Sequence, residues 1–406
     1  MEFGSSHQTR IGIVVTIGFL ALALAFSARA TLGLVMPVWE AEFGWSRSFV
    51  SGVGAAALVA MAAVAPVAGW LADRRGPLPT LALGLMTIGL GCGLVAVSDR
   101  PWLFAVGFAG VGAVGFGIVS THVVATAIAR LTEQGRGLAT GVATSGATAG
   151  QFLIVPALAV LLTAVSWRWS FGGLAAACLV LGVVVMVMLA RRSRDAARQS
   201  AITVSSLRDD LRQVLATPAF HILFWSFLAC GFTTTGVIET HFLPYAALCG
   251  FPPLPSAAAY GVLSAVNLLG MIVAGWLTDR VNRPLLLAGI YAGRALTFVL
   301  LMRVGNDVNQ LFLFAAVFGM VDYATIPATA SLVASHVGVR VMGLAMGLIA
   351  AGHAIGGALG AMAGGLGFDL TGGYTVVWFG ALWISTAAAG LVLLLARMPA
   401  REPVVV

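Results

Sequence analysis

Lysine is absent from this chain of 406 residues, so all 22 of its basic side chains are arginines. The absence excludes a phosphate-binding loop of the Gly-x-x-x-x-Gly-Lys type and a Schiff-base lysine, because both need the lysine amine. Charged residues of either sign make up only 9% of the chain, whereas soluble domains contain roughly 25%. The sequence is therefore not that of a soluble protein.

Hydrophobic residues make up 60% of the chain, and the mean hydropathy is +0.99. They form long runs, each about the length of a membrane-spanning helix, which needs roughly 20 residues. The strands of a membrane β-barrel are shorter and alternate in polarity. The composition therefore predicts an all-α integral membrane protein.

Four cysteines are scattered in or beside the apolar runs without the spacing of a metal site: Cys92, Cys178, Cys230 and Cys249. We interpret them as small buried side chains. The sequence also lacks a nucleophile motif, a phosphate loop and a soluble domain, so a membrane enzyme or a receptor has no support. We expect no catalytic residues, no metal, no cofactor and no nucleic-acid partner.

Twelve apolar segments are predicted to span the membrane, with ends uncertain by about 2–4 residues. They lie near 11–36, 49–72, 79–97, 102–129, 137–163, 169–190, 218–243, 257–279, 284–302, 309–335, 340–365 and 375–396. These segments predict two six-helix bundles, followed by a short tail. The expected divisions are a tag-like leader 1–10, a first bundle 11–190, a linker 191–216, a second bundle 217–398 and a tail 399–406.

The arginines between the spans predict the orientation. With both termini in the cytoplasm, the cytoplasmic side holds arginines 10, 74, 75, 130, 136, 191, 192, 194, 198, 208, 212, 280, 283, 340, 397 and 401. Only arginines 47, 100, 168 and 303 then fall outside. The positive-inside rule therefore predicts that both termini are cytoplasmic. We expect a multi-pass protein of a bacterial inner membrane.

The linker 191–216 is the longest polar segment, and its arginine-rich start suits anionic lipid headgroups. Leu207, Leu211 and Leu215 follow one another at helical spacing, which is consistent with a helix lying on the membrane surface. A solvated connector explains the same composition. The sequence leaves both interpretations open.

One short stretch occurs twice, as Gly-Trp-Leu-Ala-Asp-Arg at 69–74 and as Gly-Trp-Leu-Thr-Asp-Arg at 275–280. Each copy ends an apolar run of roughly helix-spanning length, which indicates two similar halves. At such a position, Asp73 or Asp279 can accept hydrogen bonds from the N-terminus of a neighbouring helix. Gly69 and Gly275 allow a close helix contact.

Twelve spans in two halves, with Gly-x-Leu-x-Asp-Arg in both the 2–3 and the 8–9 loop, resemble the major facilitator superfamily over essentially the whole chain. This resemblance implies two bundles that rock about a central site lined by helices 1, 4, 7 and 10. A monomer is the usual state in this family. The first motif departs from the family pattern at Pro77 and Pro79, where basic residues are usual, which predicts weaker contacts of this copy with neighbouring helices.

Three further stretches resemble the oxalate/formate antiporter and monocarboxylate transporter branch of that family. They are Phe-Gly-Trp-Ser at 43–46, Arg-Gly-Leu-Ala-Thr-Gly at 136–141 and Trp-Arg at 167–168. The resemblance implies a small carboxylate as the substrate. Drug/proton antiporters usually carry a Gly-Pro pair in helix 5 and an arginine in helix 4, and this chain lacks both. Export of amphipathic drugs is therefore the alternative function.

Few polar side chains lie within the spans, and each is a candidate because an ionisable group in hydrocarbon costs about 2.5–3.5 kcal/mol without a partner or water. Arg29 lies in the outer half of helix 1. Its guanidinium can bind a carboxylate through two parallel hydrogen bonds. The alternative is an arginine that extends to the outer interface. We favour anion binding.

Four further candidates for substrate binding lie in helices 4, 5, 8 and 11: His122, Gln151, Asn267 and His353. In the oxalate/formate relative, helix 11 carries a cationic substrate-binding residue, which the resemblance places at His353; a structural histidine is the alternative. Asn267 and Met271 take the positions where mammalian monocarboxylate transporters carry Asp and Arg. The missing pair leaves substrate and coupling open to differ from theirs.

The second bundle contributes the candidates for proton coupling or gating. Asp322 in helix 10 can carry the coupling proton, and Tyr323 can bind substrate or simply pack. Arg294 in helix 9 lies at a similar depth, so a fixed Asp322–Arg294 pair is an equal alternative. Glu239 and His241 near the outer end of helix 7 diverge around the helix, so only one of them can face the cavity directly.

These residues together predict a secondary transporter that works by alternating access. The expected substrate is a small organic anion, a mono- or dicarboxylate, moved with protons or in exchange for a counter-anion. An anion that bridges Arg29 in one half and His353 in the other would bias the two conformations unequally. The remaining expected partners are membrane lipids.

Overall fold

The computed structural model describes residues 2–196 and 206–399. Within them, twelve helical segments are long and apolar enough to cross a membrane, and no strand is formed. The predicted all-α fold is therefore confirmed. The predicted linker and tail lie partly outside the described residues. The structure has no break at the predicted leader, because α1 begins at Glu2.

The first half contains six spans, of which the fourth is assembled from several pieces. Its helices are α1 (Glu2–Phe43), α2 (Arg47–Arg75), α3 (Pro77–Ala96), α4 (Pro101–Ala105), the π-helix η1 (Val106–Gly112), α5 (Ala113–Ile118), α6 (Thr121–Ala129), α7 (Arg136–Ala164) and α8 (Trp167–Ala196).

The second half repeats this arrangement after a short polar helix, α9. Its helices are α9 (Leu207–Leu215), α10 (Pro218–Gly231), the π-helix η2 (Phe232–Glu239), α11 (Thr240–Leu248), α12 (Pro253–Thr278), α13 (Arg283–Leu301), α14 (Val308–Val321), α15 (Thr325–His336), η3 (Val339–Val341), α16 (Met342–Thr371), α17 (Thr375–Leu393) and η4 (Leu394–Arg397).

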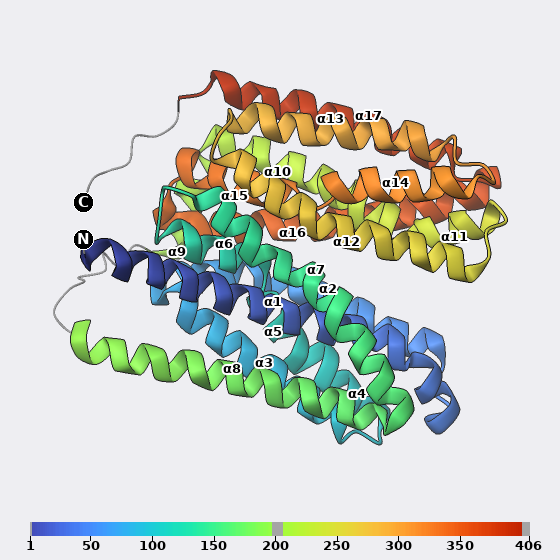
Figure 1. The fold of residues 1–406 in the computed structure, drawn as a ribbon, viewed down its shortest axis with the longest axis horizontal. Coiled ribbons are helices and arrows are strands. Elements are labelled where there is room, and N and C mark those ends of the chain that lie inside the picture. Colours follow the sequence, from blue (N-terminus) through green and yellow to red (C-terminus); the bar gives the residue numbers. More distant parts are fainter. Residues whose placement is uncertain (1, 197–205, 400–406) are drawn as a thin grey trace.

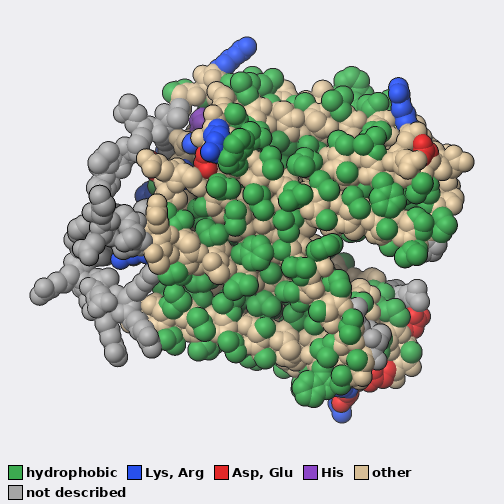
Figure 2. Space-filling model, in the orientation of Figure 1, with side chains coloured by type: hydrophobic (Ala, Val, Ile, Leu, Met, Phe, Trp, Pro, Cys, Tyr) green, Lys and Arg blue, Asp and Glu red, His purple; other side chains and the backbone are tan. Residues whose placement is uncertain are grey.

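The two halves lie side by side with their long helices roughly parallel, and α8 and α17 lie on opposite edges (Figure 1). The described chain begins and ends at the same end of the molecule, which we call the terminal end; the opposite end is the far end. Hydrophobic side chains cover much of the surface in Figure 2, whereas charged ones gather toward the two ends. This distribution is that of a bundle surrounded by lipid.

Aromatic side chains tie together the far ends of several helices in the first half. Trp39 on α1 is fully buried and packs against Phe104, Trp167 and Phe171, with ring centroids 4.7–5.9 Å apart. Trp167 also donates a hydrogen bond to the Glu42 carboxylate at 2.7 Å. Trp45 packs against Trp39 as well, with ring centroids 5.7 Å apart. The Phe-Gly-Trp-Ser and Trp-Arg stretches therefore have a packing role in this chain.

The repeated motif joins the two halves at the terminal end. The Asp73 carboxylate accepts hydrogen bonds from the backbone N–H groups of Gly343 and Leu344 at the start of α16, at 2.8 and 2.7 Å. In the equivalent place, Asp279 accepts from Gly137 and Leu138 at the start of α7, at 2.8 and 2.9 Å. Both acids thus cap a helix of the other half, as the motif predicts.

The expected weakness of the first copy is wrong. Despite Pro77 and Pro79, Asp73 makes the same two backbone bonds as its counterpart, and Arg130 adds an ion pair to it at 2.6 Å. The two prolines do no harm because they open α3, where the missing N–H groups have no helical partner to lose. Among the described residues, the first copy therefore has an ion pair to its aspartate that the second copy lacks.

The linker helix α9 attaches to the same end. The Ser206 hydroxyl caps it by accepting from Asp209 N–H at 3.2 Å and donates to the Asp209 carboxylate at 2.6 Å, which lowers the pKa of that carboxyl. Asp210 is buried and pairs with Arg340 before α16 at 2.7 Å. A helix exists where leucine spacing predicts one, and it packs on the second half.

Candidate binding site in the central cleft

A cleft separates the two halves at the far end, where the surface in Figure 2 is hollowed between two lobes. At the terminal end, by contrast, α2 contacts α16 and α7 contacts α12 closely. A cavity of about 260 Å³ lies on the first half's side, and Arg29 and Gln151 are the polar side chains in its lining. The structure is thus open toward the far end and closed toward the terminal end.

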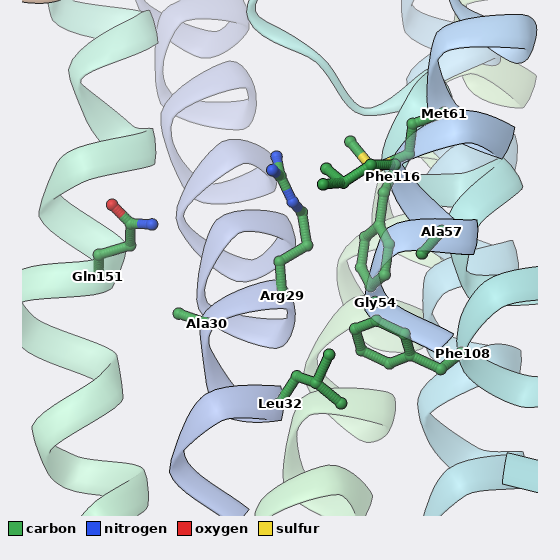
Figure 3. A pocket seen from close by; sticks show the side chains of 10 residues that line it. Arg29, Ala30, Leu32, Gly54, Ala57, Met61, Phe108, Phe116 and Gln151 are labelled. Atoms are coloured by element: carbon green, nitrogen blue, oxygen red, sulfur yellow. The ribbon is translucent and has the colours of Figure 1, made fainter. Parts of the chain in front are cut away.

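Arg29 extends from α1 toward Met61 and Phe116, while Gln151 on α7 lies on the other side of α1 (Figure 3). The Arg29 guanidinium lies over the Phe26 ring, 4.9 Å from its centroid. Among the described residues it forms no ion pair and no side-chain hydrogen bond. Its hydrogen-bonding edge is therefore available to an anion in the cleft.

The second half places an acidic and a phenolic group opposite this arginine. Tyr323 donates a hydrogen bond to the Glu239 carboxylate at 2.7 Å, and both groups interact electrostatically with Arg29. Tyr260 on α12 interacts with the same carboxylate and with Asp322. Three of the predicted residues, Arg29, Glu239 and Tyr323, thus come together across the cleft.

The tenth span is broken between α14 and α15, at residues 322–324. In hydrocarbon the backbone groups freed by such a break must find partners within the protein. Arg294 donates to the carbonyl oxygens of Val321, at 2.8 Å, and Asp322. Asn267 accepts from Tyr323 N–H at 3.1 Å. Arg294 and Asn267 therefore hold the broken helix in place.

The same network surrounds the Asp322 carboxylate without neutralising it. Asn267 donates to one carboxylate oxygen at 3.1 Å, while the other oxygen is buried without a hydrogen-bond partner among the described residues. Arg294 bonds to the backbone of Asp322 and to the Cys230 thiol, at 3.0 Å for the latter. The fixed carboxylate–guanidinium pair that the sequence left open is therefore absent from the described ion pairs.

The histidines form a separate layer, nearer the terminal end than Arg29. His353 on α16 and His122 on α6 both pack against the ring of Phe227, at centroid distances of 5.1 and 5.8 Å. His353 also lies beside Cys230. The groups that interact electrostatically with Arg29 are instead Tyr323 and Glu239. An anion bridge between Arg29 and His353 therefore stays a prediction.

His241 points away from Glu239, as the angle between their side chains requires. Its Nε2 atom lies 2.9 Å from the carbonyl oxygen of Ala361, and its ring packs against Tyr374. The side chain therefore joins α11 to α16. Glu239 is the member of the pair that reaches the cleft.

The stability of the broken tenth span is expected to depend on Arg294. Arg294→Met leaves two carbonyl oxygens without donors, at a cost of several kcal/mol each in lipid, which outweighs the gain from removing a buried charge. We expect the apparent Tm of the purified protein to fall by about 5 °C or more. The matched control, Arg303→Met on an exposed loop after α13, should leave Tm unchanged. If the R294M protein has the same apparent Tm as the wild type, Arg294 does not stabilise the broken helix.

Comparisons with known proteins bear on the whole chain. The family model described as Major Facilitator Superfamily matches residues 18–306 and 270–405. The MFS-type transporter YcxA of Bacillus subtilis is 25% identical over 84% of each chain. Monocarboxylate transporter 11 of Homo sapiens is 26% identical, over 80% of this chain and 70% of its own. Monocarboxylate transporter 13 of Rattus norvegicus is 25% identical, over 80% and 75%.

Solved structures agree in fold. The E. coli fucose:proton symporter FucP has a TM-score of 0.75 at 16% identity and covers 98% of this chain and 100% of its own. The human organic anion transporter MFSD10 has a TM-score of 0.69 at 17% identity, with 95% and 99% covered. At such identities the likeness concerns the fold alone.

Proposed function

The chain belongs to the Major Facilitator Superfamily and is a multi-pass membrane transporter rather than an enzyme, and from this premise we propose that it carries a small organic anion by alternating access. The observation that supports this most is the Arg29 guanidinium, unpaired among the described residues and facing the cleft. Relatives named as monocarboxylate transporters support a carboxylate as the anion.

We place both termini in the cytoplasm of a bacterial cell, because arginines are concentrated at the terminal end. In this proposal the far end faces outward, so the state that is open at the far end is the outward-open one, and the protein is a monomer in the inner membrane. In this state a carboxylate reaches Arg29 from outside. His122, His353 and Phe227 lie beneath it, on the route that opens when the terminal end separates.

Glu239 and Asp322, two carboxyl groups of the second half, are the groups that we propose to bind the coupled proton. An anion bound at Arg29 comes close to Glu239, so the pair of negative charges favours a proton on this side of the cleft. Asp322, buried and without a cationic side chain on its carboxylate, suits a proton that is taken up and released in each cycle. Arg294 and Asn267 position this carboxyl group, while Tyr323 links Glu239 to the broken helix.

Transport by protein reconstituted in liposomes tests the function. A carrier that moves one proton with each monovalent anion should accumulate a labelled carboxylate about ten-fold across one pH unit. The reason is that a ten-fold proton gradient can balance a ten-fold anion gradient when the two ions move together. Anion uptake that needs an internal counter-anion and ignores pH would indicate exchange instead. Uptake of amphipathic cations, with none of any carboxylate, would favour drug export.

Asp322→Asn separates coupling from binding. The amide keeps the shape and one acceptor of the carboxyl group but carries no exchangeable charge. We expect exchange of internal for external carboxylate to persist, whereas accumulation driven by a pH gradient disappears. Asp307→Asn is the matched control, because Asp307 caps the same span at the far end and asparagine caps as well. A D322N protein that still accumulates anion would place the proton elsewhere.

A further inference from the structure

The two sides of the cleft differ in chemistry around Arg29. The second half presents Glu239, Tyr323 and Tyr260, which are hydrogen-bonding or acidic groups. On the first half, the cavity beside Arg29 is lined by apolar side chains, of which the larger are Leu32, Leu58, Met61, Phe108 and Phe116. A molecule that binds through a carboxylate at Arg29 therefore meets an apolar surface with the rest of its body.

The size of this cavity suits more than a carboxylate with a methyl group. Its volume is about 260 Å³, whereas an engineered apolar cavity of about 150 Å³ already binds benzene. Phe108 and Phe116 are almost completely buried, so the rings form a fixed boundary, while Met61 is flexible enough to adapt to different shapes. The cavity thus has room for a ring or a branched chain.

A second negative charge on the ligand would find no basic side chain to bind in this cavity. Arg29 is the only basic side chain in the cavity lining, and the carboxylate that interacts with it electrostatically across the cleft is that of Glu239. A dicarboxylate would therefore place its second carboxylate against apolar side chains or near a like charge, and both arrangements cost binding energy. The geometry selects one carboxylate and one apolar tail.

We propose, building on the proposed function, that the substrate is a monocarboxylate with a branched aliphatic or aromatic tail. Its carboxylate binds Arg29, and its tail occupies the cavity between α1, α2 and the fourth span. Tail burial supplies most of the discrimination between anions, because each buried methylene contributes roughly four-fold in affinity. Gln151 is the one uncharged polar side chain in the lining of this cavity.

Binding to the purified wild-type protein at one fixed pH tests the proposal, with acetate, 3-methylbutanoate, phenylacetate and succinate as probes. We expect phenylacetate and 3-methylbutanoate to bind at least about ten-fold more tightly than acetate, and succinate to bind no better than acetate. If acetate or succinate binds as tightly as phenylacetate, the tail site is wrong while anion transport stands. If none of the four binds, the proposed function itself fails.

Two variants locate the tail. Gly54 lines the cavity, and a Cβ there would lie 3.0 Å from Leu32 Cδ2, a flexible side chain that can yield. Gly54→Val should weaken phenylacetate binding about ten-fold and leave acetate binding unchanged. The control is Gly52→Val, on the same helix, where a side chain meets open space. Met61→Ala enlarges the cavity and should shift preference toward bulkier tails; unchanged selectivity in both G54V and M61A would overturn the assignment.

Discussion

Arg29→Gln is expected to reduce carboxylate affinity by about 100-fold or more. Each hydrogen bond between a guanidinium and a carboxylate contributes about 1.5–3 kcal/mol, and glutamine can supply neither the charge nor the paired geometry. Glu239 then remains in the cleft without a basic group opposite it, which adds electrostatic repulsion of the anion. Titration calorimetry or a scintillation binding assay with a labelled carboxylate measures the loss.

Two comparisons separate a specific contact from general attraction of anions. Arg29→Lys keeps the charge but not the two parallel donors, so an intermediate affinity is expected. Arg303→Gln removes the same charge from an exposed site at the far end and should have little effect. If R29Q keeps wild-type affinity for every carboxylate, Arg29 is not the anion site, and export of amphipathic drugs becomes the better explanation.

The spans were predictable because they depend on local composition. Apolar runs of sufficient length have few alternatives to a membrane helix, and the observed spans begin and end close to the predicted ones. The first span is an instructive exception, since it continues through Pro37 to Phe43. A proline removes one helical hydrogen bond but does not end a helix that its neighbours hold, and the Trp39 cluster holds this one.

The joining of the halves was also predictable, because the motif contains both the acid and the small residue that such a contact needs. Asp73 and Asp279 cap helices of the opposite half, as expected from their chemistry. What the motif does not indicate is the state in which the contact exists. Closure at the terminal end and opening at the far end come from the packing of whole bundles.

The site was less predictable, because its contacts join residues far apart in the sequence. Arg29, Glu239 and Tyr323 were each candidates, but nothing local indicates that they face one another. The break at 322–324 had one sequence signal, Pro327, whose ring excludes the normal helix bond to residue 323. The structural roles of Arg294 and Asn267 follow only once that break is known.

The sequence does not indicate the apolar part of the cavity. Phe108, Phe116 and Met61 are ordinary residues for a membrane helix, so the sequence offers no means of telling a cavity-facing side chain from a lipid-facing one. The sequence predicts that Cys230 is a small buried side chain, and it is buried, but it also accepts a hydrogen bond from Arg294. Such pairings depend on which faces of neighbouring helices meet.

Gly69→Val is expected to abolish transport by preventing closure of the terminal end. A Cβ at this position would overlap the carbonyl oxygen of Gly343, and the obstacle is backbone rather than a movable side chain. The same holds for Gly275 and the carbonyl oxygen of Gly137 in the other contact. Since the state that is open at the far end needs both close approaches, either substitution disfavours that state and leaves the alternative, open at the terminal end, as the resting conformation.

Distances between spin-label pairs measure this shift in the purified protein. Labels on the exposed Arg75 and Val339 positions report on the terminal end, and labels on Ala41 and Leu248 report on the far end. In G69V the first distance should lengthen and the second should shorten. Gly289→Val on α13, where an added side chain meets open space, should keep the wild-type distances.

Asp73→Asn gives a graded form of the same change if the valine variant folds poorly. It removes the charge that strengthens two hydrogen bonds to α16 and the ion pair with Arg130, but it leaves the close approach of the helices intact. A loss of about 3 kcal/mol changes the ratio of the two states by roughly 100-fold. Substrate affinity measured from the far side should then fall, because less protein is open there, while Arg29 itself is unchanged. Wild-type distances in both G69V and D73N would mean that these contacts do not determine which end is open.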